Sequence, residues 1–419
     1  MQKKLNTLTL SGLMIGPILG SGIVLLPPLA INILGDKAIF AWAIIMTLGI
    51  IFAYVFAKMS LKISSNEGMS IVIGQELGQF FRELSANYLT AAVCFGPVAV
   101  ALTASEFLSH IMKNLNLNKT ILAFIVLLLC VTVILRGVTT VGKLTLAFSS
   151  LTAILLVAGS VYSLLTQSKM VYPTGLPELD KLGYALLLLF WAIIGWEVIG
   201  NYVEEVENPE KTIMRSMKVS VVAITMVYML SAFALQNRMQ LQGIHDARLN
   251  MSLILVPLFG DFAYVLMGVI AAGLCFCTLL MILGAVTRQI AVRAENGKLP
   301  AFFKMKPQEK APKHALYVLI CWHSILLILI YFKVLSIEEI VGISNTFFIG
   351  NALLGLAASI KYMNEYWVRA FILVLIIALI ILLTFSTVFA WITLIAVTVL
   401  SIGKGRKLAN KKDKDGYTT

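Results

Sequence analysis

The sequence predicts an all-α integral membrane protein with about twelve transmembrane helices. The chain of 419 residues is 59% hydrophobic and 13% charged, and its mean hydropathy is +0.91. Soluble domains are only about 45–50% apolar, so these values exclude an ordinary soluble protein. The apolar residues also fall into runs near the length of about 20 residues that a helix needs to cross a bilayer. Two of these runs contain helix-breaking residues near their middle.

The apolar runs define twelve spans joined by short polar loops. The long run near the C-terminus is divided at Thr384-Phe385-Ser386, because a single helix of that length would overshoot the membrane. No polar segment is long enough for a soluble domain, so residues 1–419 are expected to form one polytopic membrane domain. The predicted spans are residues 8–33, 38–57, 84–111, 120–135, 144–165, 184–203, 219–235, 262–284, 315–332, 337–360, 367–383 and 386–402.

The distribution of charge predicts the orientation of these spans. An even number of crossings places both termini on one side, and most of the 33 Lys and Arg residues fall on that side, including those of the basic tail 403–419. Cytoplasmic loops are enriched in Lys and Arg, so both termini are expected in the cytoplasm. The net charge of +12 then reflects topology and anionic lipid, and no nucleic-acid partner is expected.

The first span is interrupted in the middle of the membrane by Gly20-Ser21-Gly22. Unwound backbone exposes N–H and C=O groups, and the N-terminus of a half-helix attracts a carboxylate. The N–H groups around Ser21 and Gly22 are therefore predicted to hold a substrate carboxylate, with the Ile18 carbonyl turned towards the ammonium. Glycines spaced by four from Gly12 also suit close packing against another helix, and we expect both roles.

The sixth span is interrupted at Ile194-Gly195, between Phe190 and Glu197. Glu197 is the one acid placed deep in a span, where a charge costs about 2.5–3.5 kcal/mol on the insertion scale. Two roles are open for it: a gate or proton carrier, or a carboxyl bonded to nearby backbone that locks the broken helix. The positions of Trp191 and Trp196 beside the break favour a pocket wall over contact with lipid.

The sequence predicts no catalytic, metal or cofactor site. All five cysteines fall inside predicted spans. The stretch Gly137 to Lys143 resembles the start of a phosphate-binding loop, but Leu144 stands where that loop needs Ser or Thr to bind the metal. With no constellation of acid, base or metal ligands near a membrane face, an enzyme is not expected.

Three motifs occur in order along the chain: Gly20-Ser21-Gly22-Ile23 with Pro27, Phe190 to Glu197 followed by Glu205-x-x-Asn208-Pro209, and Arg293 to Pro300. Together they resemble the motifs of the amino acid–polyamine–organocation transporters. In its short length and in the residue pattern of spans six and ten, the chain looks most like the bacterial YjeH-like exporters of methionine and branched-chain amino acids. The resemblance implies a bacterial cytoplasmic (inner) membrane protein, present as a monomer or homodimer.

This resemblance also implies a core of five plus five helices related by inverted topology. Residues 8–165 would form the first repeat and residues 184–360 the second, with the two helices of 367–402 outside the core. Many relatives carry a lysine within the fifth helix, whereas this chain has only Lys143 at the mouth of that helix, which leaves the coupling ion open.

The resemblance implies a particular set of contacts around the bound substrate. Backbone at Ser21 and Gly22 would hold the α-carboxylate, and the carbonyls of Ile18, Trp191 and Ile194 would hold the α-amino group. Thr278 falls near a family position that faces the core. The substrate-binding residues are thus expected to be Ile18, Gly20, Ser21, Gly22, Phe190, Trp191, Ile194, Gly195 and Thr278, with Trp196 and Glu197 in gating or coupling.

The charge of the core spans predicts the substrate class. They offer only Glu197 and no deep Lys or Arg, so a neutral side chain fits best, and the apolar residues near the sixth break favour methionine, leucine, isoleucine or valine. We therefore expect a secondary active transporter of these L-amino acids. The resemblance to the YjeH-like exporters implies export, and protons are the expected coupling ion although the fifth helix lacks the lysine of many relatives. Two alternatives stay open: an uptake permease or exchanger, and a receptor subunit that binds an amino acid without transporting it.

Overall fold

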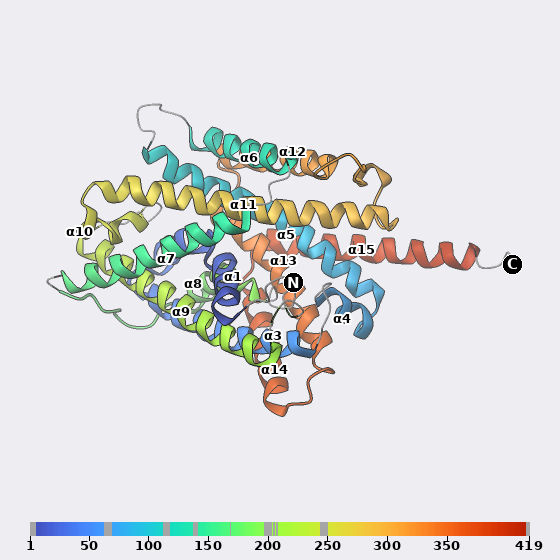
Figure 1. Ribbon diagram of the computed structural model, residues 1–419, viewed down its shortest axis with the longest axis horizontal. Coiled ribbons are helices and arrows are strands. Elements are labelled where there is room, and N and C mark those ends of the chain that lie inside the picture. The colour runs from blue at the N-terminus through green and yellow to red at the C-terminus, as the bar shows by residue number, and fades with distance from the viewer. Residues whose placement is uncertain are drawn as a thin grey trace.

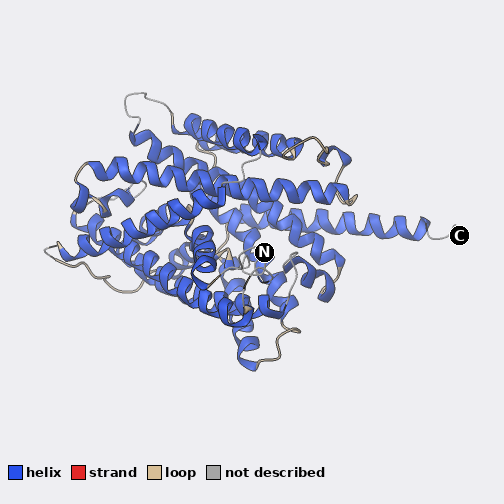
Figure 2. Cartoon of the chain, in the orientation of Figure 1, coloured by secondary structure: helices blue, strands red, loops and turns tan. Residues whose placement is uncertain are grey.

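A computed structural model describes residues 6–62, 69–111, 118–136, 141–167, 169–196, 203, 206, 208–243 and 250–415. The described chain consists of helices joined by turns and loops (Figure 2). Nine helical segments in these residues are long and apolar enough to cross a membrane. The predicted class, an all-α membrane protein, is confirmed.

Each predicted span contains at least one helix among the described residues, and the first span contains two, one on either side of its break. The count of nine is lower than twelve because α2 and α3 join through the short turn η1, and because α8 and the apolar part of α15 are short. The helices are α1 Thr7–Leu19, α2 Gly22–Leu34, η1 Gly35–Lys37, α3 Ala38–Lys62, α4 Met69–Glu76, α5 Gln79–Ile111, α6 Lys119–Arg136, α7 Val141–Leu165, α8 Leu179–Leu189, η3 Phe190–Ile193, α9 Pro209–Leu241, η5 Asn250–Ile254, α10 Val256–Phe259, α11 Phe262–Glu295, η6 Ala301–Phe303, α12 Lys313–Tyr331, α13 Ile337–Ser359, α14 Tyr366–Thr384 and α15 Val388–Asp415.

The first break separates α1 from α2. Gly20 ends α1 with φ 31° and ψ −140°, a backbone conformation that L side chains rarely adopt. Its N–H still donates to the Gly16 carbonyl at 2.9 Å, and α2 begins two residues later at Gly22. A glycine at position 20 therefore lets the chain leave the helix inside the membrane without a steric penalty.

The second break follows α8. The chain tightens into the 3₁₀ turn η3, becomes extended at Ile194 (φ −77°, ψ 141°), and turns again at Gly195 with φ 116°. Ending α8 here frees carbonyl groups in the membrane interior. The Asn345 side chain of α13 donates to two of them, those of Leu187 and Leu188, at 2.8 Å each. The break is thus supported by a neighbouring helix.

The helices pack so that the two breaks lie near the centre. Helices α5 and α11 pack along each other, α6 lies against α12 at the top of Figure 1, and α1 packs on α7 and α9. Helix α2 contacts α8, η3 and α9, so the two broken spans meet. The repeat boundaries at 8–165 and 184–360 stay a prediction.

The C-terminal region agrees with the proposed split. Helix α14 ends at Thr384, the Phe385 N–H donates to the Leu382 carbonyl at 3.2 Å, and α15 begins at Val388. Helix α15 then continues to Asp415, so most of the expected basic tail extends this helix, which projects to the right in Figure 1. The structure also adds α4, which packs on α5 and α13 and which the hydropathy pattern does not predict.

Arg293, in the third motif, joins α11 to α5. Its guanidinium donates to a Glu83 carboxylate oxygen at 3.0 Å and to the Asn87 side-chain carbonyl at 2.6 Å, and the Arg293 side chain is only 13% exposed. Asn87 in turn donates to Ser401 of α15 at 2.7 Å. One cationic side chain therefore organises three helices at one end of the bundle.

We expect Arg293→Ala to destabilise the protein, because Glu83 loses a partner in a mostly buried place. Hydrogen bonds to charged groups contribute about 1.5–3 kcal/mol, so the melting temperature in detergent should fall clearly. The matched control is Lys58→Ala. Lys58 pairs with Glu365 at 2.9 Å, but those side chains are 25% and 51% exposed. Exposed pairs contribute about 0–1 kcal/mol, so equal losses in the two variants would contradict the prediction.

Candidate substrate site at the two helix breaks

The two breaks approach each other closely. A β-carbon built on Gly195 would lie 3.2 Å from Ile18 Cγ1, and one built on Gly22 would lie 3.5 Å from Trp191 Cδ1. Residues from both predicted motifs therefore line one small region. Its geometry depends on glycine, since any side chain at these positions would enter the space between the two chains.

The Ser21 amide lies at the start of α2 and is bonded to α11. Ser21 is 1% exposed, and its N–H donates to Thr278 Oγ1 at 3.2 Å. The Thr278 hydroxyl itself donates to the Leu274 carbonyl at 3.0 Å. The Ser21 hydroxyl is buried without a hydrogen-bond partner in the part of the chain that the structure describes. The structure thus places Thr278 beside the first break.

The Ile18 carbonyl, on the other side of the break, is bonded to a residue that the sequence analysis missed. The Tyr228 hydroxyl of α9 donates to it at 3.2 Å. Tyr228 is fully buried, and its ring stacks on Trp42 with centroids 4.9 Å apart and planes inclined by 22°. The sequence does offer one signal for this residue, a tyrosine within an apolar span, because a buried phenol hydroxyl in a membrane needs a polar partner.

Trp191 packs between three helices. A β-carbon on Gly96 of α5 would lie 2.8 Å from the edge of its indole ring, and Phe348 of α13 meets the ring edge-to-face at 6.1 Å. With Gly22 of α2 on another side, the indole fills the space next to the first break. The structure thus places Trp191 beside the first break, and its role as a pocket wall stays a prediction.

The other described residues that were predicted for the sixth-span site are largely buried near the same region. Phe190 is fully buried and meets Phe52 edge-to-face at 6.2 Å. Phe190 and Ile194 line a separate cavity of about 40 Å³ with Phe52 and aromatic neighbours. Trp196 is 2% exposed. Glu197, the expected gate or proton carrier, lies outside the described residues.

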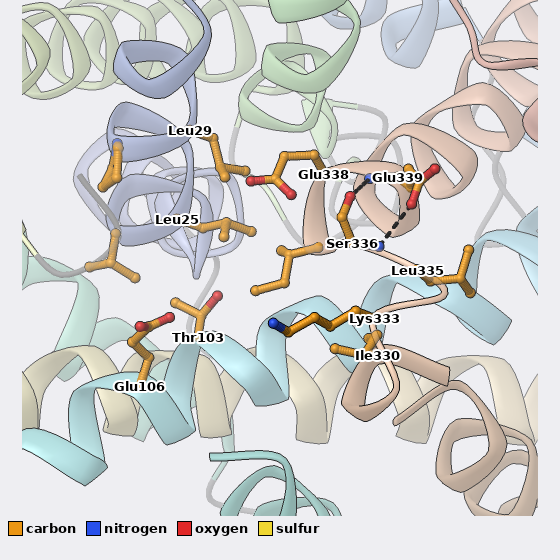
Figure 3. Close-up of a pocket in the computed structure, with 13 residues that line it drawn as sticks. Leu25, Leu29, Thr103, Glu106, Ile330, Lys333, Leu335, Ser336, Glu338 and Glu339 are labelled. Carbon is orange, nitrogen blue, oxygen red and sulfur yellow. Dashed lines mark hydrogen bonds between the residues drawn. The ribbon is translucent and has the colours of Figure 1, made fainter. Parts of the chain in front are cut away.

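A larger cavity of about 480 Å³ lies beyond the first break, between α2, α5 and the turn from α12 to α13. It begins near Leu25, whose N–H donates to the Ser21 carbonyl at 3.1 Å, so its inner end is one helical turn from the break. In Figure 3 the Lys333 amine points towards Thr103 and the Glu338 carboxylate towards Leu29. The first span crosses the membrane once, and the cavity lies beside α2, the second half of that span. The cavity is therefore on the membrane side opposite the N-terminus.

Glu106 lines the same cavity, although its position near the end of span three suggests a membrane interface. The residue is only 8% exposed, and its carboxylate pairs with the Lys119 amine of α6 at 2.6 Å. Hydropathy alone does not reveal this burial, because the pairing depends on how α5 and α6 pack. Glu106 is therefore a wall residue of the cavity.

Comparisons with known proteins agree with this architecture. The model of the amino acid permease family matches residues 5–404. The uncharacterized amino acid permease YecA of Bacillus subtilis strain 168 is 20% identical over 317 residues, which cover 74% of each chain. The L-methionine/branched-chain amino acid exporter YjeH of Escherichia coli K12 is 23% identical over 355 residues, or 84% of each chain.

A further relative is the cadaverine/lysine antiporter of Escherichia coli K12. It is 25% identical over 339 residues, which cover 78% of this chain and 75% of the antiporter. The family match extends over nearly the whole described bundle, including both breaks and the Arg293 motif. The protein therefore belongs to the amino acid permease family, within the amino acid–polyamine–organocation superfamily, and it is a multi-pass membrane transporter rather than an enzyme.

Proposed function

We propose that the protein is a secondary active transporter of neutral, apolar L-amino acids and that the two breaks form its substrate site. One observation carries the proposal. The Ser21 N–H and the Ile18 carbonyl are a buried donor and a buried acceptor at the same break. In the hydrogen bonds described above, the partner of each is a side-chain hydroxyl. An amino acid offers the matching carboxylate and ammonium, and the N-terminus of α2 favours the carboxylate.

The residues around the breaks support a neutral side chain. The described residues named at the breaks are aromatic, aliphatic, glycine or hydroxyl residues together with the amide Asn345, and none of these described residues carries a formal charge. A lysine or polyamine substrate would need a carboxylate for its second charge. Methionine, leucine, isoleucine and valine therefore remain the expected substrates, and the name of the YjeH relative, an exporter of methionine and branched-chain amino acids, supports this class.

Export across a bacterial inner membrane, with both termini in the cytoplasm, is the direction that we propose. The resemblance to YjeH supports it, whereas the names of two other relatives, a serine/threonine exchanger and a cadaverine/lysine antiporter, favour exchange as the alternative. The same site serves both, because alternating access moves substrate either way along its gradient. Protons are proposed as the coupling ion.

The direct test is transport of labelled leucine and methionine into proteoliposomes of the purified protein. Flux driven by a pH gradient supports a proton-coupled carrier, and flux that requires unlabelled amino acid inside supports an exchanger. Labelled lysine and glutamate serve as controls and should not be transported. Binding of leucine without flux in any of these conditions would contradict transport and favour the receptor alternative.

The coupling role of Glu197 has its own prediction. If this carboxyl carries the proton, Glu197→Gln should abolish the pH dependence of leucine transport, because the amide cannot take up a proton in this pH range. The measurement is the initial rate of leucine transport between about pH 5 and 8 in both proteins. A pH profile in the variant that matches the original would assign Glu197 to the structure of the broken helix instead.

A further inference from the structure

The donor and acceptor of the first break are bonded to two side chains from different helices. Tyr228 of α9 donates to the Ile18 carbonyl, and Thr278 of α11 accepts from the Ser21 N–H, at 3.2 Å in each case. A bound amino acid would present the same pair of groups, an ammonium donor to Ile18 and a carboxylate acceptor to Ser21. The protein thus carries its own replacement for both ends of the substrate.

We infer that Tyr228 takes the place of the substrate ammonium in the empty transporter and is displaced when an amino acid binds. The inference rests on the proposed function, because it assumes that Ile18 is a substrate contact. It goes further by assigning a residue that sets both the affinity for substrate and the ability of the empty transporter to close.

The physical reason is the need of a buried carbonyl for a donor. The interior of a membrane protein offers little water to satisfy a free C=O group, and a buried acceptor that loses its partner is costly. The Tyr228 hydroxyl meets this need in the absence of substrate. Binding then exchanges one hydrogen bond for another, so part of the gain from the ammonium is offset by the bond that is lost.

The position of Tyr228 is well defined. Its ring is fully buried and stacked on Trp42, and its hydroxyl lies where a β-carbon of Gly22 would come within 2.7 Å. Glycine at position 22 therefore leaves the space that the hydroxyl occupies. The Tyr228 hydroxyl and a substrate ammonium cannot both occupy the position beside the Ile18 carbonyl, so they compete for that carbonyl.

Net transport and exchange depend differently on this bond. In exchange the transporter changes conformation with substrate bound, whereas net flux requires it to return empty. If Tyr228 stabilises the closed empty form, its hydroxyl supports the return step specifically. Removing the hydroxyl should therefore strengthen binding and slow net flux relative to exchange.

The test compares Tyr228→Phe with the original protein, using labelled leucine as the probe. We expect the Kd for leucine to fall by about five- to a hundredfold, since the substrate then satisfies a carbonyl that has no partner in the empty protein. In proteoliposomes the ratio of net leucine flux to leucine exchange should fall at least about fivefold for the same reason. Tyr228→Met, which also lacks the hydroxyl, should change both quantities in the same direction.

The matched control is Tyr88→Phe. Tyr88 is also buried, at 7% exposure, but its hydroxyl bonds Thr398 of α15 at 2.8 Å. This variant should keep the original Kd and flux ratio. Unchanged or weaker leucine binding in both Tyr228 variants, with the original protein binding normally, would overturn the inference alone. If the original protein binds neither leucine nor methionine, the proposed function fails and this inference fails with it.

Discussion

Leucine in place of Gly22 should abolish binding of the amino acid while the protein still inserts into the membrane. A β-carbon at this position would lie 2.7 Å from the Tyr228 hydroxyl and 3.5 Å from Trp191 Cδ1, and a leucine adds three further carbons to the same space. The Tyr228 ring is fully buried and stacked on Trp42, so a displaced hydroxyl alone does not open enough space for a whole leucine side chain. The leucine side chain would therefore occupy the region proposed for the substrate.

Binding of labelled leucine to purified Gly22→Leu is the measurement, with membrane insertion checked by yield and gel filtration. Gly22→Ala should weaken binding less, and Gly284→Ala is its matched control, because a β-carbon there meets nothing within 4 Å. The double variant Gly22→Ala, Tyr228→Phe should recover part of the affinity, since phenylalanine lacks the clashing atom. Normal affinity in Gly22→Leu would remove the first break from the substrate site.

Asn345→Leu should strongly destabilise the protein. The Asn345 side chain is fully buried and donates to the carbonyls of Leu187 and Leu188 at the end of α8. The Leu188 carbonyl also accepts from the Phe190 N–H, so the Leu187 carbonyl depends more on Asn345. Leucine has a similar volume but no donor. Leaving a buried acceptor without a partner costs about 1–3 kcal/mol, so the loss of the Asn345 donor would remove much of the stability of the second break.

Thermal unfolding of the detergent-solubilised protein measures this effect. Thr287→Val is the control, because this equally buried hydroxyl donates to the Leu283 carbonyl of its own helix at 2.7 Å. That carbonyl can keep its backbone hydrogen bond, so the control should lose little stability. A melting temperature for Asn345→Leu as high as that of Thr287→Val would show that the α8 carbonyls find other partners.

The positions of the helices and of both breaks are predictable from the sequence. Apolar runs of about 20 residues mark spans whatever their neighbours are, and glycines within such runs mark places where a helix can end. The breaks at Gly20 and Gly195 and the split after Thr384 are confirmed for this reason. The structure also places Thr278 beside Ser21, a contact that the sequence does not predict.

Features that depend on packing between distant segments were not predictable. Tyr228 reaches Ile18 across 210 positions of the sequence, and no local pattern records that contact. Glu106 stands at a place where many acids face the headgroups, but α6 supplies Lys119 and buries it. The short helix α4 has too weak a hydropathy signal to be recognised by the length criterion for a span. In each case tertiary contacts decide the outcome.

The 480 Å³ cavity has a consequence for the electric field across the membrane. It has the exposed residue Lys333 in its wall and ends one helical turn, about 5.4 Å, from Ser21. A water-filled cavity conducts ions, so little of the membrane voltage falls along it. With water in this cavity, the voltage would instead fall between the first break and the side of the N-terminus. A charge that moves from Ser21 to that side therefore crosses most of the field, at about 2.3 kcal/mol per elementary charge for a full 100 mV.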